Sequence, residues 1–150
     1  MIKRKMIDDF LSSKKLAVVG VSRSGKKFGN TVFKELRTKG FKVFQINSNA
    51  KKINDEECFP NLNMLPEKVE AAVIVVPSYE TERVVRDAFN AGINKIWLQK
   101  GSESKEAINF CESNRMNVVY GECILMFTEP VKSIHRFHRG INKFFGMLPK

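Results

Sequence analysis

The stretch "KLAVVGVSRSGKKFGN", residues 15–30, joins an apolar run to a segment rich in glycine, serine and lysine. A short, nearly continuous apolar run is typical of a parallel strand that is covered on both faces. The glycines let the chain turn sharply, and the free N–H groups at the start of a following helix favour an anion. The stretch therefore predicts a strand, a phosphate-binding loop and the beginning of a helix.

The same alternation of strand and helix continues along the chain. Apolar runs of strand length lie at residues 15–20, 42–47, 71–77, 94–99 and 117–121, and segments of helical periodicity at 30–40, 78–92 and 102–114. Such alternation implies right-handed crossovers and an open sheet with helices on both faces. We predict an α/β, doubly wound parallel sheet of five strands in the order 3-2-1-4-5. The connection at 49–71 is expected to be irregular.

Composition and length favour one globular domain. The chain has 150 residues, of which 43% are hydrophobic and 28% charged, and no apolar run approaches the roughly 20 residues of a membrane span. We expect a single domain over 1–150, with a core at about 14–123 and an amphipathic C-terminal helix at 128–150. With no secretory signal and three scattered cysteines, a cytoplasmic location is expected.

A net charge of +10 favours a polyanionic ligand without identifying it. The C-terminal helix would carry an apolar stripe beside basic residues, which suits an RNA, an anionic membrane, the protein's own domain or a partner subunit. His135 and His138 lie three residues apart in this segment, but no recognised metal pattern surrounds them. We expect no metal site, and we leave a homodimer open.

In an open parallel sheet, ligands bind where the strand order reverses, which is here the end of the first strand. The loop at this point offers glycines, hydroxyls, an amide and cations as phosphate partners, namely Gly20, Ser22, Arg23, Lys26, Lys27, Gly29 and Asn30. It departs from the P-loop pattern, because Lys27 stands where a magnesium-binding hydroxyl is required. NTP hydrolysis is therefore not expected.

The second strand ends in a pattern that argues for a phosphorylated ribose. An NAD-binding protein usually carries an acidic residue there for the ribose 2′-hydroxyl, whereas this chain reads "QINSNAKK" at 45–52. Neutral donors followed by lysines suit NADP or the 3′-phosphate of coenzyme A. Both ligands stay open on these residues.

Together, "AVVGVSRSGKKFGN", "GFKVFQINSN", "CFPNL", "VIVVPS" and "KIWLQKG" resemble the stand-alone CoA-binding protein family. This family is similar to the N-terminal domain of the succinyl-CoA synthetase alpha subunit. The resemblance implies a Rossmann-like sheet that holds the ADP part of CoA, with the diphosphate on the loop and the adenosine with its 3′-phosphate beyond the second strand. The implied binding residues are Gly20, Val21, Ser22, Arg23, Lys26, Lys27, Phe28, Gly29, Asn30, Asn47, Asn49, Lys52, Val76, Pro77, Ser78, Gln99 and Gly101.

The chain departs from the family at "INSN", where a proline is common. We expect no ligase domain, which carries the phosphohistidine in the synthetases, within these 150 residues. Cys123 follows the fifth strand, but a nucleophile needs a neighbouring base, which the sequence alone cannot place beside it. Trp97 and Phe59 are expected in the core or as its cover rather than stacked on adenine. We therefore predict a non-catalytic module that binds CoA or an acyl-CoA. The alternatives are an NADP-dependent oxidoreductase and a protein whose basic tail binds RNA or membrane.

Overall fold

The computed structural model describes residues 4–128 of the chain, in which seven strands, four α-helices and two short 3₁₀ helices follow one another. The strands are β1 (Lys15–Val19), β2 (Lys42–Ile46), β3 (Lys52–Ile53), β4 (Glu56–Phe59), β5 (Ala71–Ile74), β6 (Lys95–Gln99) and β7 (Asn117–Glu122). The helices are α1 (Arg4–Leu11), α2 (Phe28–Thr38), α3 (Ser78–Asn90) and α4 (Lys105–Ser113), with 3₁₀ turns η1 (Leu62–Met64) and η2 (Ile124–Met126).

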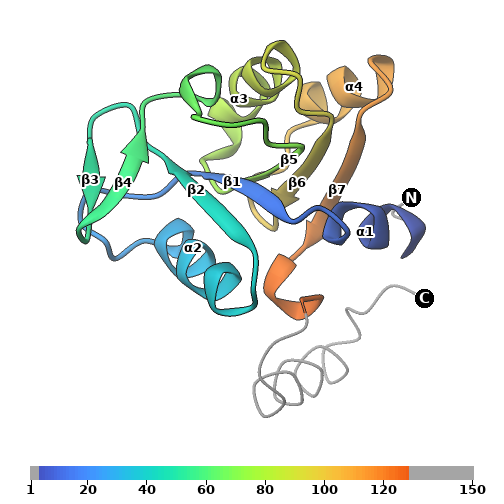
Figure 1. Cartoon of the computed structure of the whole chain (residues 1–150). Coiled ribbons are helices and arrows are strands. Elements are labelled where there is room, and N and C mark those ends of the chain that lie inside the picture. Colours follow the sequence, from blue (N-terminus) through green and yellow to red (C-terminus); the bar gives the residue numbers. More distant parts are fainter. Residues whose placement is uncertain (1–3, 129–150) are drawn as a thin grey trace.

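The strands form one sheet in the order β3-β4-β2-β1-β5-β6-β7, seen in Figure 1. Every neighbouring pair is parallel except β3 and β4. In the centre, Val19 of β1 aligns with Ile46 of β2 on one side and with Ile74 of β5 on the other. The predicted doubly wound α/β sheet is thus confirmed in outline.

The strand number and order differ from the prediction. The apolar run at 71–77 forms β5, which lies beside β1 on the side away from β2, so the five predicted strands stand in the order 2-1-3-4-5. The place outside β2 is taken by β4, from the connection at 49–71 that was expected to be irregular. Since β3 and β4 have two and four residues and the charged sequences KI and EECF, they carry no apolar run that marks a central strand.

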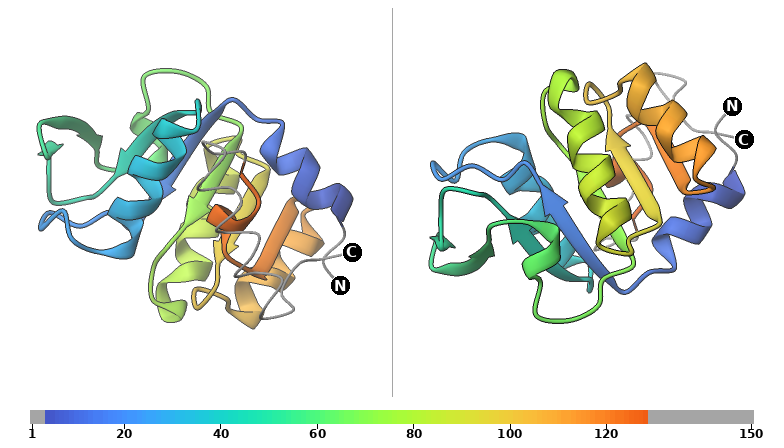
Figure 2. Two further views of the ribbon diagram at one scale, coloured as in Figure 1. Left: turned by 90° about the horizontal axis from the view of Figure 1, so that it is seen from below. Right: turned by 90° about the horizontal axis from the view of Figure 1, so that it is seen from above.

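Helices cover both faces of the sheet, as Figure 2 shows from its two sides. α1, α2 and η2 pack on one face, where Phe10 lies edge-on to the fully buried Trp97 with ring centroids 5.4 Å apart. α3, α4 and η1 pack on the other, with Val85 and Ala88 fully buried. Because β5 is covered on both faces, all four of its residues are buried, which explains its unbroken apolar sequence.

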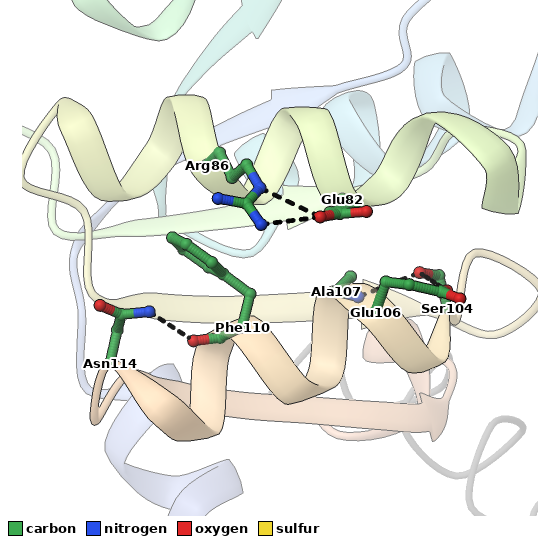
Figure 3. Close-up of polar contacts among 7 residues, drawn as sticks. All are labelled: Glu82, Arg86, Ser104, Glu106, Ala107, Phe110 and Asn114. Carbon is green, nitrogen blue, oxygen red and sulfur yellow. Dashed lines mark hydrogen bonds and ion pairs between the residues drawn. The ribbon is translucent and has the colours of Figure 1, made fainter.

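The α3–α4 layer is drawn in Figure 3. The Arg86 guanidinium binds Glu82 on the same helix at 2.8 Å and lies over the ring of Phe110 in α4, 4.5 Å from its centroid. Ser104 caps α4 by accepting a hydrogen bond from the Ala107 amide at 3.0 Å, a role for which serine is well suited. Ser78 is the first residue of α3, whose N-cap position is taken by Pro77.

In the part of the chain that the structure describes, no helix is long and apolar enough to cross a membrane. The predicted C-terminal helix, with its two histidines, lies outside the described residues.

Candidate nucleotide-binding site

The candidate site lies at the carboxyl edge of the sheet, between the ends of β1 and β5. The chain leaves β1 toward β2 on one side and later returns to β5 on the other, so this is the point where the strand order reverses. The first residue after β1, Gly20, has a φ of 117° and packs against the backbone after β5. A Cβ on Gly20 would overlap the carbonyl oxygen of Val75, so only glycine fits this position.

At its end, where α2 begins, the loop comes back into contact with Gly20, the residue at which it starts. A Cβ on Gly29 would overlap the carbonyl oxygen of Gly20, so the first turn of α2 lies directly against the end of β1. In this turn the amides of Asn30 and Thr31 donate to the Lys27 carbonyl oxygen at 3.0 and 3.4 Å, whereas those of Phe28 and Gly29 donate to no group within residues 4–128. The helix dipole adds positive potential beside these two amides. This end of α2 therefore offers backbone donors to an anion beside Gly20.

Asn30 holds the two ends of the loop together. Its side chain is 4% exposed, and its Oδ1 accepts hydrogen bonds from the amides of Ser22 at 2.9 Å and Lys27 at 3.2 Å. Its Nδ2 donates to the Ser22 carbonyl oxygen at 3.0 Å. The Asn30 carboxamide is thus engaged inside the loop, where it shapes the loop rather than extending toward a ligand.

Serine hydroxyls shape the exposed tip of the loop. The Ser22 and Ser24 hydroxyls lie 3.0 Å apart, and the Ser24 hydroxyl accepts a hydrogen bond from the Lys26 amide at 3.2 Å. The cationic side chains of Arg23, Lys26 and Lys27 are exposed around this tip. Hydroxyls, amides and cations together form a donor-rich surface that suits phosphate.

Asn47 ties the end of β2 to the loop. Its Nδ2 donates to the Val21 carbonyl oxygen at 2.9 Å, and its Oδ1 accepts from the Asn49 amide at 2.7 Å. Val21 itself is buried in the core. The predicted loop and the predicted second-strand segment therefore meet, as their positions in the sequence require.

A first cleft opens on the β2 side of Gly20, with a volume of about 320 Å³. Its lining is rich in carboxamides and small residues and comes from the ends of β1 and β2, the turn before η1, and one face of α3. The lining residues are Val19, Gly20, Ile46, Asn47, Ser48, Asn49, Pro60, Asn61, Leu62, Glu80, Arg83, Val84 and Asp87.

The residues from α3 and from the turn before η1 are absent from the sequence-based site. Those from α3 recur at spacings of three, one and three, which place them on one helical face, and this periodicity is a signal that could have found them. Arg83 lies between two acids of the same face, 3.3 Å from Glu80 and 3.4 Å from Asp87. This wall of the cleft therefore carries two carboxylates and one guanidinium.

A second cleft, of about 390 Å³, opens on the β6 side and shares Gly20 with the first. It brings together the start of α2 and the segments after β5 and β6, as predicted for several of these residues. The lining residues are Gly20, Lys27, Phe28, Gly29, Val75, Val76, Pro77, Gln99, Lys100, Gly101 and Ser102.

Buried polar contacts hold the far wall of the second cleft in place. The Ser102 hydroxyl accepts a hydrogen bond from the Val76 amide at 3.2 Å, and the fully buried Thr81 hydroxyl donates to the Ser102 carbonyl oxygen at 2.6 Å. Glu103 accepts from the Gly101 amide at 2.8 Å. Gln99, which is 3% exposed, accepts from the Ile124 amide at 3.1 Å through its Oε1. The segments after β5 and β6 thus form one connected wall.

Some predicted site residues line neither cleft. Besides the loop residues Val21, Ser22, Arg23, Lys26 and Asn30, these are Lys52 on β3 and Ser78 at the start of α3. Trp97 packs against Phe10, Phe59 packs against Phe44, and neither lines the two clefts at Gly20. Burial raises the pKa of the Cys111 thiol to about 12, and Cys58 is buried as well, whereas Cys123 is half-buried.

A donor-rich loop at the reversal point of a doubly wound sheet, with a cleft on either side, is the arrangement typical of Rossmann-like nucleotide-binding folds. Residues 14–129 match the family described as the CoA binding domain, and the chain belongs to that family. The resemblance seen in the sequence is therefore confirmed.

Among curated relatives, the chain is 30% identical over 109 residues to acetate–CoA ligase [ADP-forming] II of Archaeoglobus fulgidus, an alignment over 71% of this chain and 16% of the ligase. It is 25% identical over 130 residues to the alpha subunit of acetate–CoA ligase [ADP-forming] II of Pyrococcus furiosus, over 79% of this chain and 28% of the subunit. The chain thus spans less than a third of these relatives.

Among solved structures, a conserved hypothetical protein from Pyrococcus furiosus is 37% identical with a TM-score of 0.69, over 74% of this chain and 96% of that protein. A hypothetical protein from Pyrococcus horikoshii has a TM-score of 0.77 at 24% identity, over 93% and 94% of the two chains. The latter shows the shared fold alone. Neither the oxidoreductase nor the basic-tail alternative gains support from these matches.

Proposed function

We propose that this protein binds coenzyme A or an acyl-CoA through its ADP moiety, at the carboxyl edge of the sheet and without catalysing a reaction on it. The observation that carries the proposal is the contact of Gly20 with Gly29, which brings the first turn of α2 and the donor-rich loop to the strand-reversal point. Membership of the CoA binding domain family supports the choice of ligand.

In this proposal the ligand lies across Gly20, with one part in each cleft. The diphosphate contacts the loop at 20–30 and the N–H groups of the first turn of α2. The adenosine occupies the first cleft, where the lining carboxamides of Asn49 and Asn61 suit a base and a ribose. The pantetheine arm follows the second cleft along Val76 and Pro77. Apolar walls with a few placed polar groups suit such an arm.

The 3′-phosphate needs a cation near the first cleft. The sequence favours Lys52, which stands exposed on β3 at the edge of the sheet. The cation that lines the cleft is Arg83, but its charge is already shared by Glu80 and Asp87. Because a neutralised guanidinium attracts a further anion less strongly, we assign the 3′-phosphate to Lys52.

Titration calorimetry of the full chain with CoA, dephospho-CoA and NADP tests this proposal. We expect CoA to bind most tightly, and the loss of the 3′-phosphate to weaken binding about ten-fold, as for one charge-assisted contact. Lys52→Ala is expected to remove most of that difference, while Arg83→Ala retains it. The opposite result would assign the 3′-phosphate to Arg83, and a preference for NADP, or no binding of CoA, would overturn the proposed function.

A further inference from the structure

The hairpin formed by β3 and β4 projects from the edge of the sheet beside the loop at residues 20–30, which we call the phosphate loop. Its two strands pair antiparallel, with Lys52 opposite Glu57 and Ile53 opposite Glu56. The connecting residues Asn54 and Asp55 have positive φ angles of 52° and 65°, as both central residues of a type I′ turn require. The turn is therefore tight, and its shape is set by the backbone.

A buried glutamine fixes this hairpin to the sheet. Gln45 of β2 is 1% exposed, and its Nε2 lies 3.4 Å from the carbonyl oxygen of Ile53, 3.1 Å from that of Glu56 and 3.2 Å from that of Glu57. These carbonyls flank the turn on both sides. A buried carboxamide with its donors satisfied by backbone is costly to displace, so the turn has a defined position relative to β2.

The side chain of Asn54 then meets the tip of the loop. A Cβ on Gly25 would lie 2.9 Å from both Nδ2 and Oδ1 of Asn54, so the carboxamide occupies the space directly beside the Gly25 backbone. Val21 of the loop and Ile53 of the hairpin are both buried in the hydrophobic cluster on the α2 face of the sheet. The loop is thus supported at its base by Asn47 and Asn30 and at its tip by Asn54.

We propose that Asn54 is a positioning residue for the phosphate loop. Asn54 acts through its contact with Gly25, and Gln45 holds the hairpin turn that presents Asn54 to the loop. The inference rests on the proposed function, because it assigns the positioned loop to the diphosphate of the ligand. A loop that is already ordered loses less conformational freedom when it binds an anion. Removing the Asn54 side chain therefore weakens phosphate binding without touching the ligand.

A pair of substitutions in the same turn tests this role. Asn54→Gly removes the carboxamide, while glycine retains the positive φ at that position. Asp55→Gly makes the matched change at the next residue, which also has a positive φ. Within residues 4–128, the Asp55 side chain forms no hydrogen bond or ion pair with the loop. Each variant is titrated by NMR with ADP, which carries the diphosphate, and with adenosine, which does not.

We expect Asn54→Gly to lower the affinity for ADP about five-fold or more and to leave the affinity for adenosine unchanged. A loss of this size corresponds to ordering the backbone of about one additional residue when ADP binds. Asp55→Gly is expected not to weaken either ligand. Equal weakening of ADP and adenosine by Asn54→Gly would indicate a general structural role and overturn the inference. Unchanged ADP affinity in Asn54→Gly would overturn it too.

Hydrogen exchange of the ligand-free proteins separates this inference from the proposed function. The amides of Gly25 and Lys26 are bonded to the Ser22 carbonyl oxygen at 3.0 Å and to the Ser24 hydroxyl at 3.2 Å, so their exchange reports opening of the loop. We expect this exchange to be faster in Asn54→Gly and unchanged in Asp55→Gly. Exchange at the wild-type rate in Asn54→Gly contradicts the positioning role. If the wild-type protein bound neither CoA nor ADP, the proposed function would be contradicted. Faster exchange in Asn54→Gly would in that case still establish that Asn54 supports the loop.

Discussion

The backbone of Gly29, in the first turn of α2, lies in direct contact with the carbonyl oxygen of Gly20 at the end of β1. Eight residues separate them in the sequence, yet a single methyl group does not fit between them. This contact brings the N-terminus of a helix to the point where the sheet changes direction, and it is the reason that this edge of the sheet can hold an anion.

Replacing Gly29 by alanine is expected to break this contact. The overlap with the Gly20 carbonyl forces the helix or the loop to move, which costs about 1–3 kcal/mol of unfolding free energy and displaces the anion-binding N–H groups. We expect the Kd for CoA to rise at least about ten-fold, as measured by calorimetry.

Gly40→Ala is the matched control at the other end of α2. Gly40 has a φ of 98° and open space around its Cα, so alanine costs about 1 kcal/mol of conformational strain without a clash near the loop. Loss of stability with unchanged CoA affinity is expected. If the two variants lowered CoA affinity equally, the contact between Gly20 and Gly29 would have no special role.

Asn30→Asp tests the internal bonds of the loop with almost no change of shape. The aspartate can still accept from the Ser22 and Lys27 amides, but its second oxygen faces the Ser22 carbonyl, to which the amide donates at 3.0 Å. A lost bond and a buried repulsion are expected to lower the unfolding free energy by about 1–3 kcal/mol. The added negative charge is expected to weaken binding of CoA as well.

The same substitution at Asn114 serves as a comparison, because its side chain donates to the Phe110 carbonyl oxygen at 2.8 Å on the exposed end of α4. We expect Asn114→Asp to leave CoA binding unchanged. Chemical denaturation and calorimetry of both variants measure the two effects, and unchanged stability in Asn30→Asp would contradict the described loop.

Glu67 makes the stability of the sheet depend on pH. Its carboxylate binds Lys15 of β1 at 2.7 Å and Lys42 of β2 at 2.6 Å, and these hydrogen bonds hold the pKa of Glu67 below its ordinary value. A carboxyl whose pKa is lower in the folded state stabilises the fold above its unfolded pKa, and this contribution is lost as the pH falls through its folded pKa.

We therefore expect Glu67→Gln to reduce stability in urea unfolding at about pH 7, and we expect the difference from the wild type to shrink toward about pH 3. Glu57→Gln, on the exposed hairpin, is the control, because the ion pairs found in residues 4–128 do not include Glu57. A Glu67→Gln effect that stays constant across this pH range would show that the carboxylate charge does not contribute.

The three cysteines are expected to react in a fixed order. Burial raises the pKa of the Cys111 thiol to about 12 and also raises the pKa of Cys58, while Cys123 is only half-buried. Since the thiolate is the reactive form, we expect an alkylating reagent at about pH 8 to label Cys123 first and the other two only after unfolding. Mass spectrometry of the labelled peptides measures the order, and early labelling of Cys111 would contradict the packing of α4.

Much of the central sheet could be predicted because strands that are buried on both faces have nearly continuous apolar sequences. β5 and residues 16–19 of β1 are unbroken apolar runs, and Gly20 follows β1 at a point where no other residue fits. The edge of the sheet could not be predicted in the same way. β3 and β4 are held by hydrogen bonds from Gln45 and by a two-residue turn, and such contacts between distant segments leave no periodic pattern.

The same contrast holds for the site. The loop is a local feature, so its residues follow directly from the glycine and lysine spacing. The α3 wall with Glu80, Arg83 and Asp87, and the turn with Asn61, reach the first cleft only because η1 packs against α3. The side chains of Asn30 and Asn47 read as ligand donors in the sequence, but they bind the backbone of the loop. Sequence shows which polar groups are present, whereas the fold decides which of them are already engaged.

The most direct test of the account is an NMR titration of the ¹⁵N-labelled full chain with CoA, in which the glycine amides serve as reporters. Gly20, Gly29 and Gly101 line the two clefts, while Gly40 and Gly92 follow the ends of α2 and α3 at the opposite edge of the sheet. We expect the amides of the first three to shift on addition of CoA and those of the last two to remain in place. Shifts at Gly40 and Gly92 alone, or none at any glycine up to about millimolar CoA, would contradict a CoA site at the carboxyl edge.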